Sequence, residues 1–227
     1  MYPPGSDKQY SVTALICTLN EAENLPHVLP QIPQWVDEIL IVDGHSTDNT
    51  AETAKELSPK AVIVTQTGKG KGNALKEGVN QASGDIIVTL DADGSTDPRD
   101  MSKYIEPLID GYDFAKGSRF LRNRPKMRLY RQFGNWVLAT TANILYGAKY
   151  TDVCSGYNAF SKNTFQSMRL INDGFEMEQE MVVKIRKMRL KVIEVHQYDA
   201  GRMSNSSKVS GIKQGFTDLW IIIKERF

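Results

Sequence analysis

Residues 85–94 read Asp85-Ile86-Ile87-Val88-Thr89-Leu90-Asp91-Ala92-Asp93-Gly94, an apolar run that ends in two carboxylates. The apolar run predicts a strand. Side chains two positions apart on an extended chain point to the same side, so Asp91 and Asp93 face together. Such a pair is stable beside a cation that neutralises it, and hard oxygen ligands suit Mg²⁺ or Mn²⁺. The pair predicts a metal site that carries a diphosphate, with a solvated turn as the plainer alternative.

Strand-like and helix-like stretches alternate on the N-terminal side of this segment. We expect strands at 12–18, 38–42, 61–65 and 85–90, and helices at 21–29, 48–57 and 71–81. Nearly continuous apolar strands in this rhythm predict an α/β fold, with a mostly parallel central sheet and helices on both faces. Ligands of such sheets bind beyond the carboxyl ends of the strands. Polar clusters follow three of these ends, at 18–21, 43–48 and 91–93, so we expect them to line one rim.

The second half of the chain is less regular. It predicts strands at 112–116, 157–160 and 191–197, and helices at 129–146, 175–188 and 211–227. We divide the chain into a loose leader (1–9), one domain (10–210, with halves 10–95 and 96–210) and a C-terminal amphipathic helix (211–227). The apolar side of that helix carries Ile212, Phe216, Leu219, Trp220 and Ile223. The helix either packs on the domain or lies at a membrane surface.

The composition is that of a soluble globular protein, with 41% hydrophobic and 24% charged residues. The 28 basic and 27 acidic residues nearly balance, which gives no reason to expect a nucleic-acid partner. Basic residues nevertheless concentrate in 116–131, which holds no acidic residue and could meet an anion. No signal peptide or membrane-spanning stretch is recognisable, and Cys17 and Cys154 lack metal-site spacing. We expect a cytoplasmic protein, with peripheral contact to the inner face of the membrane as an option.

The third expected helix begins in the glycine-rich segment 68–74. Glycines let a backbone approach a ligand closely, and a helix N-terminus with Lys71 favours negative charge. The segment lacks the ending of a Walker A loop. The segment predicts an anion site near Lys71, with a plain solvated turn as the alternative.

Taken in order, residues 18–21, 42–48 and 91–94 resemble the nucleotide half of the family 2 glycosyltransferases, which have the GT-A fold. The segments 117–120, 152–157, 174–180 and 201–208 continue the resemblance over most of the chain. The nearest branch is the polyprenyl-phosphate sugar synthases, similar to dolichyl-phosphate mannose synthase. The resemblance implies inverting transfer of a hexose from a nucleotide-sugar donor to a polyprenyl phosphate acceptor, with Mg²⁺ or Mn²⁺.

The resemblance makes 10–95 the nucleotide-binding half and 96–210 the acceptor half of the domain, and it also implies residue roles. The nucleotide-binding set is Thr18, Leu19, Asn20, Glu21, Asp43, Lys71, Asp91, Ala92 and Asp93, and Asp91 and Asp93 hold the metal. The set that grips the acceptor phosphate is Arg119, Arg131, Arg202 and Ser207, and the catalytic candidates are Asp93, Glu178 and Glu180. Asp152 borders the sugar pocket or stabilises its own turn. Gly44 stands where many relatives carry a second acidic residue, which leaves the base open between uracil and guanine.

The acceptor class decides whether a general base is needed. A phosphate monoester is already anionic near neutrality, because its second pKa is about 6. A saccharide hydroxyl, the acceptor in polysaccharide synthesis, must give its proton to a carboxylate, for which Glu178 and Glu180 are the candidates. A sugar nucleotidyltransferase would carry a glycine-rich loop with Arg and Lys at 17–21, which this chain lacks. The intact pair of Asp91 and Asp93 argues against a non-catalytic nucleotide-binding module.

Overall fold

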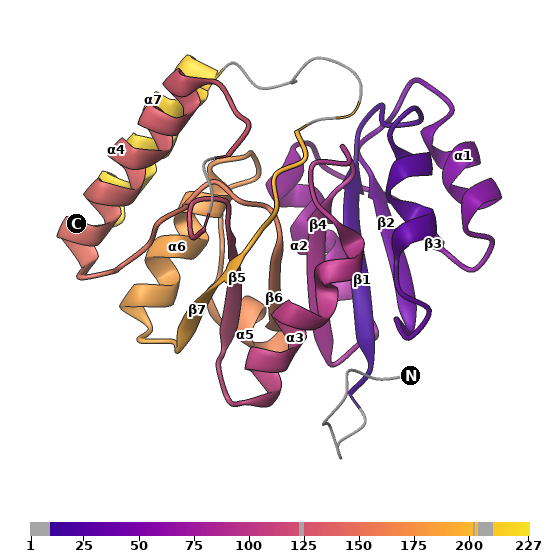
Figure 1. Ribbon diagram of the computed structural model, residues 1–227, viewed down its shortest axis with the longest axis horizontal. Helices are drawn as coiled ribbons and strands as arrows, with labels where there is room; N and C mark the ends of the chain where they lie inside the picture. Colours follow the sequence, from indigo (N-terminus) through magenta and orange to yellow (C-terminus); the bar gives the residue numbers. More distant parts are fainter. Residues whose placement is uncertain (1–9, 123–124, 202, 204–210) are drawn as a thin grey trace.

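The protein forms one seven-stranded mixed sheet in the order β3-β2-β1-β4-β6-β5-β7 (Figure 1). The computed structural model describes residues 10–122, 125–201, 203 and 211–227. The strands are β1 (Val12–Thr18), β2 (Glu38–Asp43), β3 (Val62–Thr65), β4 (Ile86–Asp91), β5 (Phe114–Ser118), β6 (Asn158–Ser161) and β7 (Val192–His196). β6 is antiparallel to both of its neighbours, whereas the other pairs are parallel. The predicted mostly parallel α/β sheet is confirmed.

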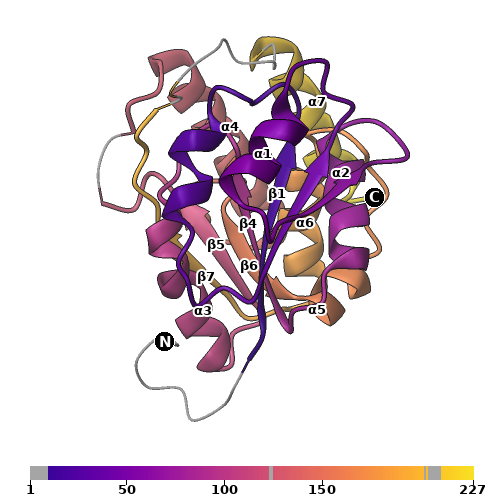
Figure 2. The same cartoon turned by 90° about the vertical axis from the view of Figure 1, so that its right-hand side faces the viewer.

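Helices cover both faces of the sheet (Figures 1 and 2). One face packs against η1 (Leu25–His27), η2 (Leu29–Gln31), α1 (Thr50–Leu57) and α3 (Met101–Ile109), the last preceded by η3 (Pro98–Asp100). The other face packs against α2 (Lys71–Gln81), α5 (Lys162–Ser167) and α6 (Met177–Lys187). Helices α4 (Leu129–Tyr146) and α7 (Gly211–Lys224) lie outside α6 and share a third apolar cluster with it. The core therefore has two layers beside the sheet and a smaller third one under α4 and α7.

Three helical segments differ from the expectation. The helix expected at 21–29 is two separate 3₁₀ turns, each with a proline, Pro26 or Pro30, in its first positions. Proline has no amide hydrogen and clashes with a preceding helical turn, so a continuous α-helix cannot run through both. Helices α3 and α5 were not expected. The first contains Pro107, and the second is only six residues long.

The C-terminal helix packs on the domain, which is one of the two expected outcomes. It does so through Ile221 and Ile222, which are buried. Of the side that the sequence marks as apolar, Leu219 contacts the third cluster, whereas Phe216 and Trp220 are exposed. This helix thus has one apolar side in the core and another in solvent.

Strand register brings the expected polar clusters to one level. Thr18 at the end of β1 is opposite Asp43 at the end of β2, and Cys17 is opposite Asp91 at the end of β4. The carboxyl ends of these neighbouring parallel strands therefore form one rim of the sheet. The expectation that the clusters after β1, β2 and β4 share an edge is confirmed.

Candidate active site

A hydrogen-bonded loop cluster surrounds Asp43 at one end of the rim. The Thr18 hydroxyl donates to Asp43 Oδ1 over 3.1 Å, and the Ser46 amide donates to Asp43 Oδ2 over 2.9 Å. The Thr47 amide donates to the Asn20 side-chain oxygen over 2.7 Å. Residues 18–21 and 43–48, far apart in sequence, are thus fixed against each other before any ligand arrives.

The space beside Gly44 is narrow. A Cβ placed on Gly44 would lie 3.1 Å from the Thr18 carbonyl oxygen and 3.3 Å from the amide nitrogen of Gln66. The Gln66 side chain therefore occupies the side of Gly44 on which an added side chain would lie. Leu19 is exposed on the rim, whereas Glu21 is buried and accepts a hydrogen bond from Asn24. Of these predicted nucleotide-binding residues, Leu19 is the one open to a ligand and Glu21 supports the loop.

Lys71 joins the two halves of the chain. Its Nζ lies 2.7 Å from Asp91 Oδ1 and 2.7 Å from Glu178 Oε1 at the start of α6. It also lies 5.7 Å from the centre of the Phe175 ring. Burial alone would lower the pKa of Lys71, but the two carboxylates outweigh it and raise the pKa above its ordinary value. The structure therefore brings two predicted site residues, Asp91 and Glu178, to the ammonium group of a third, Lys71, which is partly buried.

A small pocket lies behind this ion-pair cluster and is lined by Cys17, Thr89, Gly156 and Asn158 beside Lys71 and Asp91. Burial raises the pKa of the Cys17 thiol to about 12, so this cysteine lines the pocket as a neutral thiol. Gly156 is a site residue that the sequence reasoning did not single out. A Cβ on Gly156 would lie 2.7 Å from both Asp91 Oδ1 and Lys71 Nζ. Its position inside a segment of family resemblance was the only available signal.

The segment Asp91-Ala92-Asp93 turns away from β4 at the rim. Ala92 is buried, and Asp93 Oδ1 accepts a hydrogen bond from the Ser95 amide over 3.0 Å. Within the described part of the chain, no group of three or more His, Cys, Asp or Glu side chains could hold a metal. Mg²⁺ commonly binds through one or two carboxylates and completes its shell with water and substrate phosphates. The donor chemistry of Asp91 and Asp93 fits that mode of binding.

The glycine-rich start of α2 is filled by protein. Gly70 has a φ of 93°, and a Cβ there would lie 2.4 Å from the Asp173 carbonyl oxygen. A Cβ on Gly72 would lie 2.7 Å from the Asn172 carbonyl oxygen, and the Asn73 amide donates to Asp173 over 3.0 Å. The 172–173 loop packs against these glycines, whereas we expected a ligand to lie against their backbone. Within this segment, the Lys71 side chain reaches Asp91 and Glu178 at the rim.

Glu180 does not join the rim cluster. Its side chain is fully buried, and its carboxylate accepts hydrogen bonds from the Ile171 amide (3.0 Å), the Asn172 amide (3.0 Å) and the Asn172 side chain (2.8 Å). A carboxylate with these partners fixes the loop that packs on α2. The geometry argues against the expected catalytic role of Glu180, because no acceptor can reach it without breaking this loop.

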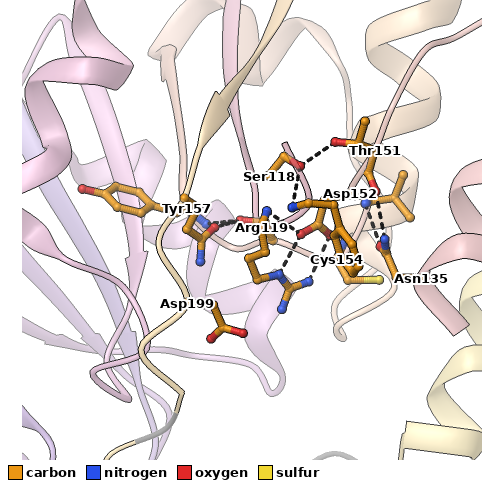
Figure 3. A network of polar contacts seen from close by, with 12 residues as sticks. Ser118, Arg119, Asn135, Thr151, Asp152, Cys154, Tyr157 and Asp199 are labelled. Carbon is orange, nitrogen blue, oxygen red and sulfur yellow. Dashed lines mark hydrogen bonds and ion pairs between the residues drawn. The ribbon is translucent and has the colours of Figure 1, made fainter. Parts of the chain in front are cut away.

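Arg119 forms a two-pronged ion pair with Asp152 (Figure 3). The Nε–Oδ2 distance is 2.7 Å and the Nη2–Oδ1 distance is 3.0 Å, and the Asp152 side chain is fully buried. Burial alone would raise the pKa of Asp152, but Arg119 and, to a smaller extent, Lys116 bring it below its ordinary value. Asp152 also accepts a hydrogen bond from the Cys154 amide, so the turn role considered for it is confirmed. Asp152 thereby fixes the direction of the guanidinium.

The other acceptor residues are only partly described. Arg131 lies in the first turn of α4 and donates to the Tyr130 hydroxyl over 3.2 Å. Gly211 at the start of α7 lies beside the Tyr130 ring, so this end of α4 faces α7. Arg202 and Ser207 fall outside the described residues. Their assignment to the acceptor phosphate stays a prediction.

Comparison with known proteins gives the family of this chain. Residues 13–169, more than half of the chain, match the glycosyl transferase family 2 profile. The chain is 36% identical over 191 residues to glycosyltransferase AglJ of Haloferax volcanii, covering 82% of this chain and 61% of that protein. It is 32% identical over 216 residues to a dolichol-phosphate mannosyltransferase of Pyrococcus furiosus, covering 88% of this chain and 59% of that one. The chain thus spans about six tenths of the length of these two relatives.

Another relative matches along most of its length. A UDP-N-acetylglucosamine–dolichyl-phosphate N-acetylglucosaminyltransferase of Methanococcus voltae is 32% identical over 208 residues, covering 80% of this chain and 82% of that protein. Among solved structures, glucosyl-3-phosphoglycerate synthase of Mycobacterium tuberculosis with Mn²⁺ and UDP-glucose superposes with a TM-score of 0.74. That match is 19% identical and covers 96% of this chain and 80% of the other, which establishes the GT-A fold. The chain is an enzyme that belongs to glycosyl transferase family 2.

Proposed function

We propose that this enzyme moves a hexose from a UDP- or GDP-linked donor to a polyprenyl phosphate, with inversion at the anomeric carbon. The bond from that carbon to the diphosphate oxygen breaks, an oxygen of the acceptor phosphate forms the new bond, and the nucleoside diphosphate leaves. The names of the Pyrococcus furiosus and Methanococcus voltae relatives, which refer to dolichol phosphate or dolichyl phosphate, support this acceptor class.

The rim of the sheet is the proposed donor site. The preformed cluster of Thr18, Asn20 and Asp43 would receive the base and ribose, with Leu19 in contact and Glu21 supporting the loop from behind. Asp91 and Asp93 would hold Mg²⁺ or Mn²⁺, with Ala92 as the buried spacer between them. The metal, when bound, neutralises negative charge on the leaving diphosphate.

Lys71 adds a cation beside the same leaving group. In the structure its Nζ bridges two carboxylates 2.7 Å away. A diphosphate oxygen could replace one of these partners without leaving the ammonium unpaired. We therefore propose that Lys71 binds the diphosphate and stabilises the charge that builds as the sugar bond breaks. By analogy with glycoside hydrolysis, positive charge builds on the sugar while the leaving diphosphate gains negative charge.

Both candidate bases, Glu178 and Glu180, already have partners within the protein, and this observation carries the choice of acceptor. Glu178 is ion-paired with Lys71, so accepting a proton would break that pair. Glu180 is fully buried and accepts three N–H groups from residues 171 and 172. A phosphate acceptor needs no base, whereas a saccharide hydroxyl would require one of these two carboxylates. We propose Arg119, Arg131, Arg202 and Ser207 as the acceptor-phosphate contacts, because Arg binds phosphate through several donors.

The compartment follows from the same chemistry. Cys17 and Cys154 are free thiols, which suits a reducing environment. We place the reaction at the cytoplasmic face of a membrane, because a polyprenyl acceptor is lipid-embedded. No helix among the described residues has the length and apolar character needed to cross a bilayer.

A transfer assay tests the proposal directly. Purified protein with Mn²⁺ or Mg²⁺ is given UDP-glucose, UDP-N-acetylglucosamine or GDP-mannose, and either a short polyprenyl phosphate or the matching polyprenol with a free oligosaccharide. We expect sugar on the phosphate alone and loss of product with Asp93→Asn. Glu178→Gln should raise KM for the donor through Lys71 while leaving the pH profile of kcat unchanged.

Two results would overturn the acceptor assignment. One is transfer to the oligosaccharide with none to the polyprenyl phosphate. The other is loss of the acid limb of the kcat profile in Glu178→Gln, because that limb would report a carboxylate acting as a base. Either result would favour the saccharide-hydroxyl reaction.

A further inference from the structure

Gln66 is a buried residue whose side-chain oxygen is unpaired. It is the first residue after β3 and is 4% exposed. Within the described part of the chain, its side-chain oxygen has no hydrogen-bond partner. A buried polar atom without a partner costs free energy, so native proteins keep few of them. An unpaired group of this kind at the edge of a proposed substrate site is a candidate for contact with the substrate.

Strand register places Gln66 at the rim of the sheet. Asp43 at the end of β2 is opposite both Thr18 of β1 and Thr65 of β3, so Gln66 follows one position beyond this level. The Gln66 amide donates to the Asp43 carbonyl over 3.0 Å, which fixes its backbone beside the end of β2. The Gln66 side chain therefore starts from the same edge of the sheet as the loop cluster around Asp43.

The Gln66 carboxamide lies beside Gly44. A Cβ on Gly44 would be 3.3 Å from Gln66 Nε2 and 3.6 Å from the Leu19 Cβ. Gly44 is half-buried and Leu19 is exposed, so this part of the rim is open to solvent. A half-turn about the last side-chain bond of glutamine exchanges its oxygen and its nitrogen in the same space. Either atom of the carboxamide can therefore face the rim.

The neighbouring acceptors already have partners in the protein. The Asp43 carboxylate accepts hydrogen bonds from the Thr18 hydroxyl and from the amide and hydroxyl of Ser46. The Thr18 carbonyl accepts a hydrogen bond from the Gly44 amide over 2.8 Å. The Gln66 carboxamide instead brings an acceptor that no described residue uses, with a donor next to it. A ligand that presents one donor beside one acceptor would match this group.

We propose that the Gln66 carboxamide binds the edge of the donor base and selects uracil over guanine. Uracil presents its N3–H beside a carbonyl oxygen, so it can donate to Gln66 Oε1 and accept from Gln66 Nε2 in one plane. This inference rests on the proposed function, whose donor site it extends, and it narrows the donor to a UDP-sugar.

Guanine fits the carboxamide less well. Its N1–H lies beside an amino group, and these two donors match a carboxylate rather than a carboxamide, which has a single oxygen. If guanine used its N1–H and O6 instead, its amino group would need another acceptor, and the Thr18 carbonyl already accepts from Gly44. A ligand that leaves a polar group unpaired in such a site binds more weakly. Gly44 contributes to this selection, because an acidic side chain at position 44 would supply the missing carboxylate.

Nucleotide binding tests the inference without any acceptor. Calorimetric titration in the presence of Mn²⁺ compares UDP, GDP and N3-methyl-UDP, in which a methyl group replaces the hydrogen on N3. We expect the wild type to bind UDP about tenfold or more tightly than either of the others. Gln66→Leu, of similar size but without a polar atom, should weaken UDP binding about tenfold and bind UDP and N3-methyl-UDP equally. Gln81→Leu, exposed at the end of α2, is the matched control and should change none of the affinities.

A purely structural role for Gln66 predicts a different pattern. Gln66→Leu removes a buried unpaired oxygen, so thermal melting should stay the same or rise. Lower melting with an equal loss of affinity for UDP and GDP would mean that Gln66 only supports the loop, and it would overturn the inference. Wild-type binding of GDP or N3-methyl-UDP as tight as that of UDP would overturn it as well.

Transfer assays separate this inference from the proposed function. A preference for UDP that depends on Gln66, with no transfer to polyprenyl phosphate from any donor, would retain the base selection and reject the acceptor. Transfer to polyprenyl phosphate from GDP-mannose but from no UDP-sugar would retain the acceptor and overturn the base selection. Transfer from a UDP-sugar, with a raised KM and an unchanged kcat in Gln66→Leu, would support both, because the base lies away from the reacting bond.

Discussion

The nucleotide half and the acceptor half of this protein arrange their polar residues in different ways. In the first, backbone register of parallel strands puts Thr18, Asp43 and Asp91 on one edge. In the second, the sheet turns antiparallel at β6, and Arg119 is oriented by a buried partner, Asp152. The first arrangement follows from local sequence pattern, and the second depends on tertiary contacts.

At the candidate active site the two halves meet at Lys71. Lys71 and Asp91 come from the nucleotide half, and Glu178 and Gly156 come from the acceptor half. A change at this junction should affect chemistry, whereas a change deep in the acceptor half should affect stability first. A loss of stability without a loss of catalysis at the junction, or the opposite deep in the acceptor half, would contradict this contrast.

The largest expected effect is at the rim. Asp91→Asn or Asp93→Asn removes the negative charge that would hold the metal, with little change in shape. Because a metal contributes several kcal/mol to stabilising the leaving charge, we expect transfer to fall by about 100-fold or more. Initial rates over a Mn²⁺ titration measure this. Asp110→Asn, at an exposed position after α3, is the matched control. Full activity in the rim variants would remove the metal from the proposal.

The next effect is on stability, in the acceptor half. Asp152→Asn would leave the Arg119 guanidinium, whose side chain is 18% exposed, without its counter-ion. Breaking a buried pair from one side costs about 3–5 kcal/mol. Urea unfolding of the variant measures this loss.

The pH dependence of the same pair has a definite sign. The folded pKa of Asp152 is below its unfolded value, so its stabilisation is present above the unfolded pKa and is lost as pH falls through the folded one. Wild type and Asp152→Asn should therefore converge in stability under acid conditions, below about pH 4. A gap that persists there would mean that packing, rather than charge, sets the cost.

The sequence predicts the first half of the molecule better than the second, for a physical reason. The apolar runs, their alternation with helical stretches and the polar residues after each run predict β1 to β4 and their rim. Asp43 and Asp91 could therefore be placed from the sequence. The contacts of Glu180 with residues 171–172 and of Asp152 with Arg119 are tertiary, and spacing along the chain does not encode them. The sequence left the packing of α7 open between the domain and a membrane surface, because this helix has apolar residues on two sides, of which Ile221 and Ile222 are buried whereas Phe216 and Trp220 are exposed.

A smaller effect is expected where the halves touch. Gly156→Ala would place a Cβ 2.7 Å from Asp91 Oδ1 and Lys71 Nζ, the ends of two side chains that can move apart. We expect about a tenfold loss of kcat/KM for the donor, which corresponds to about 1.4 kcal/mol of lost transition-state stabilisation. Thermal melting should be nearly unchanged. Gly134→Ala on α4 has no heavy atom within 4 Å of the new Cβ and should be neutral or slightly stabilising. If Gly156→Ala instead unfolds the protein, the junction is structural.

The change expected to affect transfer least concerns Asp218, on the inner side of α7. Burial, together with Glu178 and Glu176, raises its pKa to about 7 against a hydrogen bond from Gln214 of 2.8 Å. An acid with a raised folded pKa stabilises most below its unfolded pKa of about 4, and this contribution is lost as pH rises toward 7. Asp218→Asn keeps the acceptor for Gln214 and removes the buried charge. The rise of about three pKa units corresponds to about 4 kcal/mol before solvent screening, so a clear gain of that order or somewhat less is expected in urea unfolding at pH 8, and almost none at pH 4. An equal gain at both values would mean that the charge is not the cause and that α7 is held by its apolar contacts alone.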